Sequence, residues 1–283
     1  MRISVITVNY NNKTGLEATI KSVIHQTFKD YEFIIIDGGS TDGSKEVINL
    51  HQEQIDYWVS ERDKGVYNGM NKAIHIARGE YCIFMNSGDC FFSDTVLEEV
   101  FSKNPSSDYI AGNYSDGTVI KKSPKELTLR YMYEDAICHQ AVFIRTSLLK
   151  SSPYDESYRI AADWAQMFDA LILHDASYSY QDIVIASLQP DGMSKKGWKE
   201  LADDRKQHLK EVLPQRILKS LQQEHIQQQI TTEQSKLYAE IMYLSSSPKL
   251  LSVVKSLVSL LYHLLLRRNK EKWTTPESPK QRT

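Results

Sequence analysis

The chain has 283 residues, of which 25% are charged and 41% hydrophobic, and its formal net charge at pH 7 is −2. This length can bury a large core, and the composition is ordinary for a folded soluble protein. Cys82, Cys90 and Cys138 are too few and too scattered for a disulfide framework or a four-cysteine zinc site, which indicates a reducing compartment. A short apolar run followed at once by polar residues opens the chain in place of a secretory signal, so we expect a cytoplasmic protein.

The front of the chain alternates short apolar runs with helical patterns. We expect strands at residues 3–8, 31–36, 56–60 and 81–85, and helices at 14–26, 45–51 and 66–77. Alternation at this spacing is typical of βαβ units, whose right-handed crossovers build a parallel sheet with helices on both faces. The sequence therefore predicts an α/β fold with a doubly wound, mostly parallel sheet.

The regular alternation of predicted strands and helices ends after Asp94. We expect helices at 94–103 and 160–173, and strands at 108–114, 140–145 and 178–187. Beyond residue 195 the residues are polar, Gln-rich and helix-favouring. We therefore predict a domain over 1–195, a helical C-terminal extension over 196–273, and a disordered Pro-rich tail over 274–283.

Three acidic residues follow separate predicted strands, namely Asp37, Asp63 and Asp89. In open α/β sheets, ligands bind just beyond the carboxyl ends of the strands, so we expect these carboxylates to converge in one cleft. Each residue also has a purely structural interpretation: an Asx turn for Asp37, a surface ion pair for Asp63 and a helix cap for Asp89. Convergence at a single sheet edge favours the functional interpretation.

Six short blocks follow one another in the order seen in family 2 glycosyltransferases. They are residues 7–11, 36–43, 60–65, 71–73, 77–81 and 86–89. The chain resembles this family over residues 1–195. The resemblance implies the GT-A fold, with a nucleotide-binding half at 1–93 and an acceptor-side half at 94–195. It also implies a metal-assisted, inverting transfer without a covalent intermediate.

The resemblance places a nucleotide-diphospho-sugar, with a UDP-sugar as the expected donor, against the front half. The residues expected to bind it are Val8, Asn9, Tyr10, Asn11, Asp37, Arg62, Asp63, Asn71, Ser87 and Gly88. For Arg62, an exposed ion pair with Asp63 is the alternative.

Asp89 resembles the metal-binding aspartate of the family, which joins the cation to the donor pyrophosphate. Mg²⁺ and Mn²⁺ prefer oxygen ligands and are often held by one or two carboxylates plus phosphate oxygens. Asn86 and Gly88 stand where many relatives carry further acids, which leaves the identity of the metal open.

Asp163 resembles the aspartate of the acceptor-side helix, which serves as the general base. Its structural alternative is a carboxylate stabilised by the helix macrodipole near the start of a helix. Because Ala162 and Trp164 flank it, we expect partial burial and a raised pKa.

Residues 137–143 resemble a block that borders donor and acceptor. From this block we expect His139 and Gln140, together with Trp164, to contact the acceptor or the diphosphate. Residues 191–194 resemble a glycine-serine element, which would be either a mobile flap over the donor or a turn.

Residues 250–266 form a nearly continuous apolar run within a basic tail. The run is about three residues short of the roughly 20 that span a bilayer, and it contains Lys255. We predict an amphipathic interfacial helix over 249–268, with residues 249–272 contacting the inner face of the cell membrane. An ordinary core helix or a homodimer helix is the alternative.

Together these features predict an inverting transfer to a hydroxyl of a glycan or lipid-linked saccharide in bacterial-type surface polysaccharide synthesis. No nucleic-acid partner is expected. A sugar nucleotidyltransferase is one alternative, although such enzymes usually carry a Gly-rich basic loop where this chain has residues 9–12. A non-catalytic sugar-nucleotide-binding scaffold is the other alternative, prompted by the few acids around Asp89.

Overall fold

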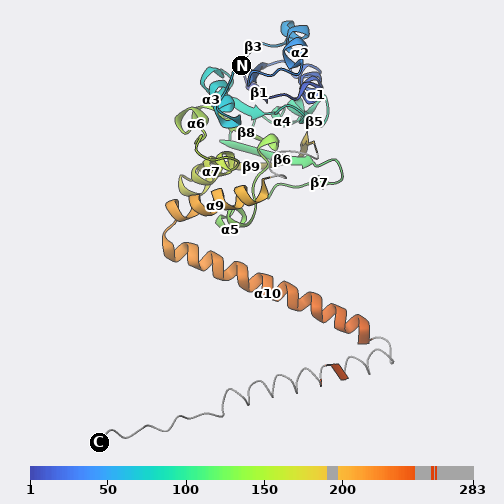
Figure 1. Ribbon diagram of the computed structural model, residues 1–283, viewed down its shortest axis with the longest axis vertical. Coiled ribbons are helices and arrows are strands. Elements are labelled where there is room, and N and C mark those ends of the chain that lie inside the picture. Colours follow the sequence, from blue (N-terminus) through green and yellow to red (C-terminus); the bar gives the residue numbers. More distant parts are fainter. Residues whose placement is uncertain (190–196, 246–255, 258, 260–283) are drawn as a thin grey trace, which may run out of the picture. The chain divides into compact units, whose positions relative to one another are not determined.

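The computed structural model in Figure 1 describes residues 1–189, 197–245, 256, 257 and 259. The chain divides into two compact units, Met1–Leu218 and Lys219–Thr283. The predicted element at 191–194, the tail at 274–283 and most of the amphipathic segment at 249–268 lie outside the described residues.

A single mixed sheet forms the centre of the first unit. Its strands lie in the order β3 (Tyr57–Ser60), β2 (Tyr31–Asp37), β1 (Ile3–Asn9), β4 (Tyr81–Phe84), β8 (Val142–Arg145), β6 (Tyr109–Ser115), β9 (Tyr178–Ser187) and β5 (Cys90–Phe91), and β7 (Ile120–Lys121) pairs with β6. The four front strands pair in parallel, as the sequence predicts.

The back half departs from the parallel pattern. Strand β8 runs antiparallel to both β4 and β6, and β5 runs antiparallel to β9, while β6 and β9 are parallel. Because β8 begins at the sheet edge where β4 ends, it must run away from that edge. The short 3-10 turn η2 (His139–Ala141) just before β8 therefore lies beside the end of β4. This turn replaces the start of the strand predicted at residue 140.

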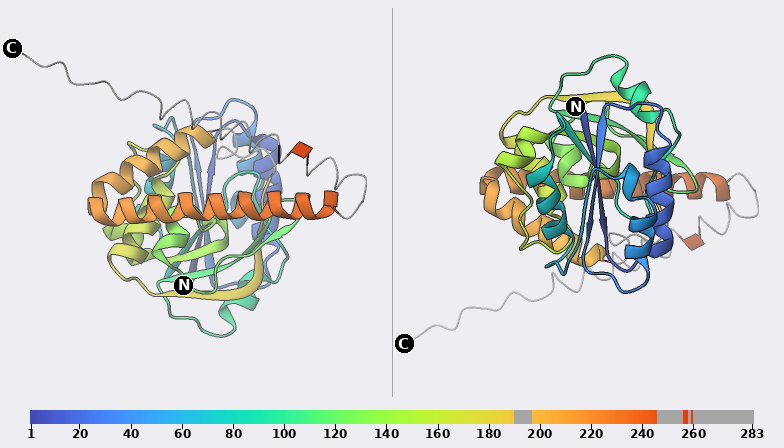
Figure 2. Two further views of the ribbon diagram at one scale, coloured as in Figure 1. Left: turned by 90° about the horizontal axis from the view of Figure 1, so that it is seen from below. Right: turned by 90° about the horizontal axis from the view of Figure 1, so that it is seen from above.

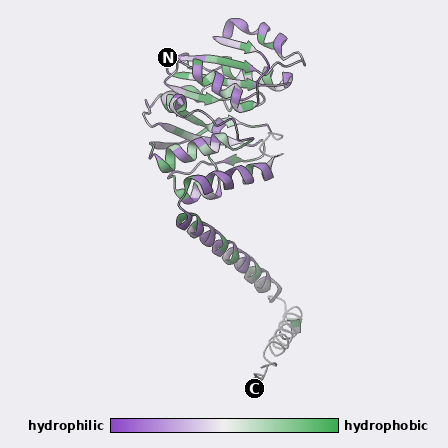
Figure 3. Cartoon of the chain, turned by 60° about the vertical axis from the view of Figure 1, so that its left-hand side comes forward, coloured by the Kyte–Doolittle hydropathy of each residue, from purple (hydrophilic) through white to green (hydrophobic). Residues whose placement is uncertain are grey.

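Helices cover both faces of the sheet (Figure 2). On one face are α1 (Lys13–Ile24), α2 (Ser44–Leu50) and α4 (Val96–Phe101); on the other are α3 (Val66–Ile76), α6 (Thr146–Ser151) and α7 (Ala162–Phe168). Alternate residues of each front strand face opposite layers, so Val5 packs with the α1 layer and Val8 contacts α3. Figure 3 shows the strands as the most apolar part of this unit.

Several helices differ from the predicted spans. The helix predicted over 160–173 is α-helical as α7 and then continues as the π-helical turn η3 (Asp169–Leu173). The short helices η1 (Gln52–Gln54) and α5 (Leu129–Glu134), together with α6 and the two-residue strands β5 and β7, were not predicted. Such short elements depend on tertiary contacts and leave little periodicity in the sequence.

The helix α9 (Trp198–Val212), which the sequence assigned to the C-terminal extension, belongs to the first unit. Arg205 explains the attachment, because its Nη2 donates to the carbonyl oxygens of Met132, Tyr133 and Asp135 at 3.0, 3.1 and 2.7 Å. The guanidinium carbon also lies 4.6 Å from the centroid of the Trp164 ring. A cation over an indole face adds attraction beyond the hydrogen bonds.

The long helix α10 (Gln215–Ser245) follows α9 and crosses the boundary between the two units. Among the residues with described placement, we find no helix that combines the length and the apolar character needed to traverse a bilayer.

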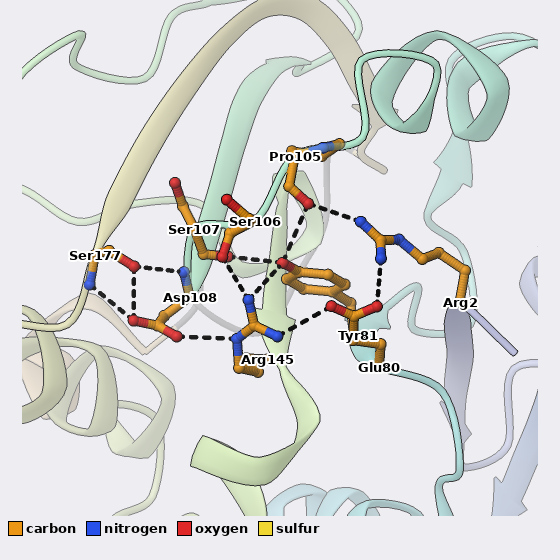
Figure 4. Close-up of polar contacts among 9 residues, drawn as sticks. All are labelled: Arg2, Glu80, Tyr81, Pro105, Ser106, Ser107, Asp108, Arg145 and Ser177. Atoms are coloured by element: carbon orange, nitrogen blue, oxygen red, sulfur yellow. Dashed lines mark hydrogen bonds and ion pairs between the residues drawn. The ribbon is translucent and has the colours of Figure 1, made fainter.

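Arg145, at the end of β8, organises the sheet edge where β1 and β4 begin (Figure 4). Its guanidinium donates to Asp108 Oδ1 at 2.9 Å, to Glu80 Oε1 at 3.0 Å and to the Tyr81 hydroxyl at 3.0 Å. Arg2 pairs with the other oxygen of Glu80. The network ties the starts of β1 and β4 to the end of β8, at the opposite end of the sheet from the predicted site.

We expect Arg145→Met to lower the free energy of unfolding by about 1–3 kcal/mol, because it strips hydrogen-bond donors from two partly buried carboxylates. Chemical denaturation measures this change. Lys122→Met is the control, since Lys122 and Asp182 form an ion pair whose side chains are 64% and 61% exposed. Its loss should change stability by no more than about 0.5 kcal/mol. Equal effects of the two variants would contradict the role given to Arg145.

Candidate active site

The carboxyl ends of the four front strands meet at one edge of the sheet. The register pairs Asn9 with Asp37 and Asp37 with Ser60, and the Ser87 N–H donates to the Val8 carbonyl at 3.1 Å. Asp63 comes close as well, because a Cβ added to Gly38 would lie 2.7 Å from Asp63 Oδ2. A larger residue at position 38 would force that carboxylate to move.

Asp37 is fully buried and holds this edge together. Its two oxygens accept from the side chains of Asn9, Ser40 and Ser60 at 2.7, 2.5 and 2.6 Å, and from the N–H groups of Gly39 and Ser40 at 3.2 and 2.9 Å. Burial favours the neutral acid, but these hydrogen bonds outweigh it and keep the pKa of Asp37 below its usual value. The Asx-turn interpretation is therefore realised in the structure, and direct contact of Asp37 with a nucleoside stays a prediction.

Hydrogen bonds join the loop after β1 to the loop after β2. The Asn11 N–H donates to Ser40 Oγ at 2.8 Å, and the Thr41 N–H donates to Asn11 Oδ1 at 2.9 Å. Asn11 adopts a left-handed φ of 48°, which asparagine tolerates better than most residues. The Tyr10 side chain, in the loop after β1, is 65% exposed, so its ring is available to a planar ligand.

The turn that presents Asp89 is tied to α1. Asn12 caps α1 by accepting from the Gly15 N–H at 3.1 Å, and its Nδ2 donates to the Ser87 carbonyl at 2.8 Å. Gly88 has a φ of 108°, and a Cβ there would lie 2.8 Å from Gln189 Oε1. The positive φ favours glycine at position 88, and a side chain there would also displace the end of Gln189. Ser87 and Gly88 shape the turn through their backbones, and their contact with a donor stays a prediction.

Asp89 has few partners for a partly buried carboxylate. Its Oδ2 accepts from Gln140 Nε2 at 2.8 Å, and its Oδ1 accepts from the Gln189 N–H at 3.3 Å. Burial raises the pKa of Asp89 above its ordinary value, and the Gln140 hydrogen bond and the positive field of His139 oppose that shift only in part. Asp89 does not act as the helix cap that was its structural alternative, since its side chain bonds to Gln140.

Oxygen atoms suited to a hard cation lie at this turn. Within the described residues, the buried Oδ1 of Asn86 has no hydrogen-bond partner. No group of three or more His, Cys, Asp or Glu side chains able to hold a metal occurs in the described part of the chain. A divalent cation here would therefore bind Asp89, with substrate oxygens completing the shell, which suits Mg²⁺ or Mn²⁺.

Asp163, at the start of α7, is held from two sides. His139 Nδ1 lies 2.8 Å from Asp163 Oδ2, and the Tyr67 hydroxyl donates to Asp163 Oδ1 at 2.9 Å. The side chains of His139 and Asp163 are 18% and 17% exposed, so the pair is shielded but reachable. His139 Nε2 in turn lies 3.4 Å from the side-chain amide of Asn86, and the adjacent Gln140 donates to Asp89.

The electrostatics of this pair correct one expectation. Burial does favour neutral Asp163, but the His139 charge and the hydrogen bonds from His139 and Tyr67 prevail, so the pKa of Asp163 falls below its usual value. Burial likewise opposes a charge on His139, yet Asp163 and Asp89 raise the pKa of the imidazole. The predicted rise in the pKa of Asp163 was wrong, because the sequence does not show that a cationic partner from η2 faces it.

The structure also places three other expected residues. Trp164 is only 2% exposed, and its indole N–H donates to the Met132 carbonyl at 3.1 Å, so it packs in the core and is closed to an acceptor. Asn71 brackets Tyr154 by donating to its carbonyl at 2.8 Å and accepting from its N–H at 3.0 Å. Arg62 is exposed, and within the described range it forms no ion pair with Asp63.

Sequence reasoning missed Tyr67 and Asn12. Asn12 precedes a predicted helix and fits the preference for asparagine at an N-cap, so this signal was present. Tyr67 lies two residues after Gly65 in the predicted helix over 66–77, and nothing in its spacing distinguishes it from a core residue. Only the placement of α7 against α3 reveals its contact with Asp163.

Sequence comparison connects the chain to known proteins. The model described as glycosyl transferase family 2 matches residues 4–172. The PGL/p-HBAD biosynthesis glycosyltransferase of Mycobacterium bovis (strain BCG / Pasteur 1173P2) is 27% identical over 197 residues, which cover 67% of this chain and 77% of that protein. The putative teichuronic acid biosynthesis glycosyltransferase TuaG of Bacillus subtilis (strain 168) is 32% identical over 146 residues, covering 48% of this chain and 56% of TuaG.

Solved structures share the fold. S. aureus TarS 1-349 in complex with UDP superposes with a TM-score of 0.58 at 21% identity, covering 71% of this chain and 63% of that one. The mannosyltransferase PcManGT from Pyrobaculum calidifontis, in complex with GDP-Man and Mn²⁺, gives a TM-score of 0.59 at 13% identity, with 92% and 80% coverage. The chain spans only 38% of the longer TarS chain. At these identities the likeness establishes the GT-A fold.

We expect His139→Asn to reduce stability more at about pH 5.5 than at about pH 8.5. A raised His pKa adds stability below its usual 6.5, which is lost as pH rises through the raised value. A lowered Asp pKa adds stability above its usual 3.8, which is lost as pH falls through the lowered value. The pair therefore stabilises the fold most between pH 3.8 and pH 6.5, where Asp163 is ionised and His139 is protonated.

Thermal unfolding of wild type and variant at both pH values measures this dependence. His174→Asn is the control, because His174 is exposed in the turn after η3. Its effect should be the same at both pH values. A His139→Asn effect that is independent of pH would show that no charged His139–Asp163 pair forms.

Proposed function

The chain belongs to glycosyl transferase family 2 and is a glycosyltransferase, and from this premise we propose that it transfers a sugar from a nucleotide-diphospho-sugar to a saccharide hydroxyl with inversion at the anomeric carbon. One observation carries the proposal. Asp163, a shielded but reachable carboxylate, pairs with His139, and the adjacent Gln140 donates to Asp89. Two adjacent residues, His139 and Gln140, thus link the candidate base Asp163 to Asp89 on the leaving-group side.

The donor would lie along the edge formed by β1, β2 and β4. The exposed Tyr10 ring suits stacking on a nucleobase, and Asp63, beside Gly38, offers oxygens for base or ribose donors. We propose a UDP-sugar. The TarS structures with UDP and UDP-GlcNAc support this choice, whereas the PcManGT structure with GDP-Man makes a guanosine donor the competing possibility. Arg62, exposed at the same rim, is the candidate cation for the diphosphate.

Asp89 would hold Mg²⁺ or Mn²⁺. When bound, such a cation neutralises negative charge on the departing diphosphate. Solved GT-A relatives that carry Mn²⁺ with a nucleotide support this assignment.

Asp163 would accept the proton of the acceptor hydroxyl. As the hydroxyl oxygen bonds to the anomeric carbon, the bond from that carbon to the diphosphate breaks, and its electron pair leaves with the diphosphate. A single displacement of this kind inverts the anomeric carbon and needs one base. Asp163 remains ionised throughout the neutral range and can accept the proton, although the His139 charge that lowers its pKa also makes it a weaker base than an isolated aspartate. His139 and Tyr67 hold it in place, and Gln140 orients Asp89.

We place the reaction in the synthesis of a surface glycan, with a glycan or a lipid-linked saccharide as acceptor. The named roles of the mycobacterial relative and of TuaG in PGL/p-HBAD and teichuronic acid biosynthesis support this placement. The basic, apolar sequence at 249–272 supports work at the inner face of the membrane, where a lipid-linked acceptor is presented. A non-catalytic sugar-nucleotide-binding scaffold is the second candidate, favoured by the single carboxylate at the Asp89 turn.

We expect Asp163→Asn to lower kcat by about 10²–10⁴-fold with little change in donor KM, because it removes proton transfer from the transition state. Release of nucleoside diphosphate from a panel of UDP-, GDP- and dTDP-sugars, with Mn²⁺ and a saccharide acceptor, measures it. Asp169→Asn is the matched control, since Asp169 also pairs with a histidine, His208, at 2.8 Å but lies one helical segment away. Its turnover should stay near that of wild type.

Asp89→Ala tests the donor side in the same assay. It should abolish turnover and also remove the Mn²⁺-dependent part of the thermal stabilisation by nucleoside diphosphate, since ligands that bind the folded state raise its stability. Wild-type-like turnover of Asp163→Asn would remove Asp163 as the base. Donor binding without transfer by the wild-type protein, across the whole panel, would favour the scaffold.

Removal of residues 249–283 should move the protein from the membrane fraction to the soluble fraction, because each basic side chain near an anionic leaflet contributes about 1 kcal/mol. Fractionation of cells expressing either form measures this partition. A shorter deletion, of 274–283 alone, retains the basic apolar segment and should stay with the membrane. Unchanged partition of the longer deletion would refute the membrane contact.

A further inference from the structure

Tyr67 lies between the donor half and the base. It belongs to the first turn of α3, the helix that follows the Asp63 loop, and it is 7% exposed. Two residues later, Gly69 packs so closely on β1 that an added Cβ would lie 2.9 Å from Val8 Cγ1 and 3.5 Å from Asp63 Oδ2. The backbone that carries Tyr67 is therefore fixed against the donor-side elements.

The Tyr67 hydroxyl reaches across to the start of α7. It contacts two acceptors there, the Ile160 carbonyl oxygen and Asp163 Oδ1, the latter at 2.9 Å. These acceptors belong to the loop before α7 and to its first turn. A phenol has one proton and donates to one of these acceptors at a time, and the ionised carboxylate is the stronger acceptor of the two.

A neighbouring tyrosine shows that this hydrogen bonding is specific. The Tyr154 ring lies 5.7 Å from the Tyr67 ring, centroid to centroid. Within the described residues, the buried Tyr154 hydroxyl has no hydrogen-bond partner. Close packing of two rings here therefore does not by itself direct a hydroxyl to an acceptor, and the contact of Tyr67 with Asp163 is a separate feature.

We propose that Tyr67 is a positioning residue that, with His139 on the other oxygen, fixes the Asp163 carboxylate where it receives the acceptor proton. The inference rests on the proposed transfer reaction, and it adds a link from the donor-side helix α3 to the base. His139 faces Asp163 from η2 and supplies the positive charge. The Tyr154 phenol and the Cys138 thiol are the other titratable groups nearby, and burial raises the pKa of both, so they stay neutral.

Tyr67→Phe tests this role, because it keeps the ring and removes only the hydroxyl. We expect kcat to fall about tenfold to a hundredfold, the loss typical of one hydrogen bond to a charged group, with donor KM nearly unchanged. The acid limb of the kcat profile should also move to higher pH, because an ionised carboxylate that loses a donor has a higher pKa. Tyr154→Phe is the matched control and should change neither kcat nor the profile.

A double-mutant cycle separates positioning from packing. If Tyr67 acts through Asp163, adding Tyr67→Phe to Asp163→Asn should cause no further loss of turnover. The same loss in both backgrounds, or a Tyr67→Phe profile identical to that of Tyr154→Phe, would overturn the proposal. If the wild-type protein transfers sugar, Asp163→Asn abolishes the transfer and Tyr67→Phe leaves it intact, this inference alone is refuted. Absence of transfer by wild type with every donor would sink the proposed function and the inference together.

Discussion

The parallel pairing of β1 with both β2 and β4 is the constraint on which the rest of the site depends. It brings three strand ends to the same level of one sheet edge, so that every loop leaving that edge must share the same small volume. Asp37 then fixes the loops, since its buried oxygens collect hydrogen bonds from three successive segments, represented by Asn9, Ser40 and Ser60. A buried carboxylate whose hydrogen-bond capacity is filled in this way stabilises the arrangement of the loops.

Three aspartates at or near this edge show how partners decide the properties of a buried acid. Asp37 is surrounded by neutral donors and Asp163 by a histidine and a phenol, and the pKa of each falls below its usual value. Asp89 has one amide and one distant N–H, and its pKa rises. Burial opposes ionisation in all three, so the difference lies in the donors that the fold supplies. Asp89, which receives the fewest hydrogen bonds of the three, is the aspartate that resembles the metal ligand of the family.

The antiparallel strand β8 makes the two halves of the site one unit. Because it starts where β4 ends, the turn before it carries His139 to Asp163 and Gln140 to Asp89. Two adjacent residues thereby contact the base candidate and the metal-ligand candidate. Tyr67 adds a second connection from α3. The candidate base, at the start of α7, is thus held by segments from both halves of the fold.

The sequence by itself determined the alternating front half, the position of Asp37, Asp63 and Asp89 at strand ends, and the family, because these depend on local periodicity and on short ordered blocks. The tertiary structure decided which side chains meet. That Trp164 turns into the core while its neighbour Asp163 pairs with His139 depends on how α7 packs against α3, α9 and η2. The direction of β8, the burial and hydrogen bonding of Asp37 and the lowered pKa of Asp163 likewise follow from contacts between segments far apart in the chain. Such contacts leave no period or spacing in the sequence, because burial and charge pairing arise only once the layers have packed.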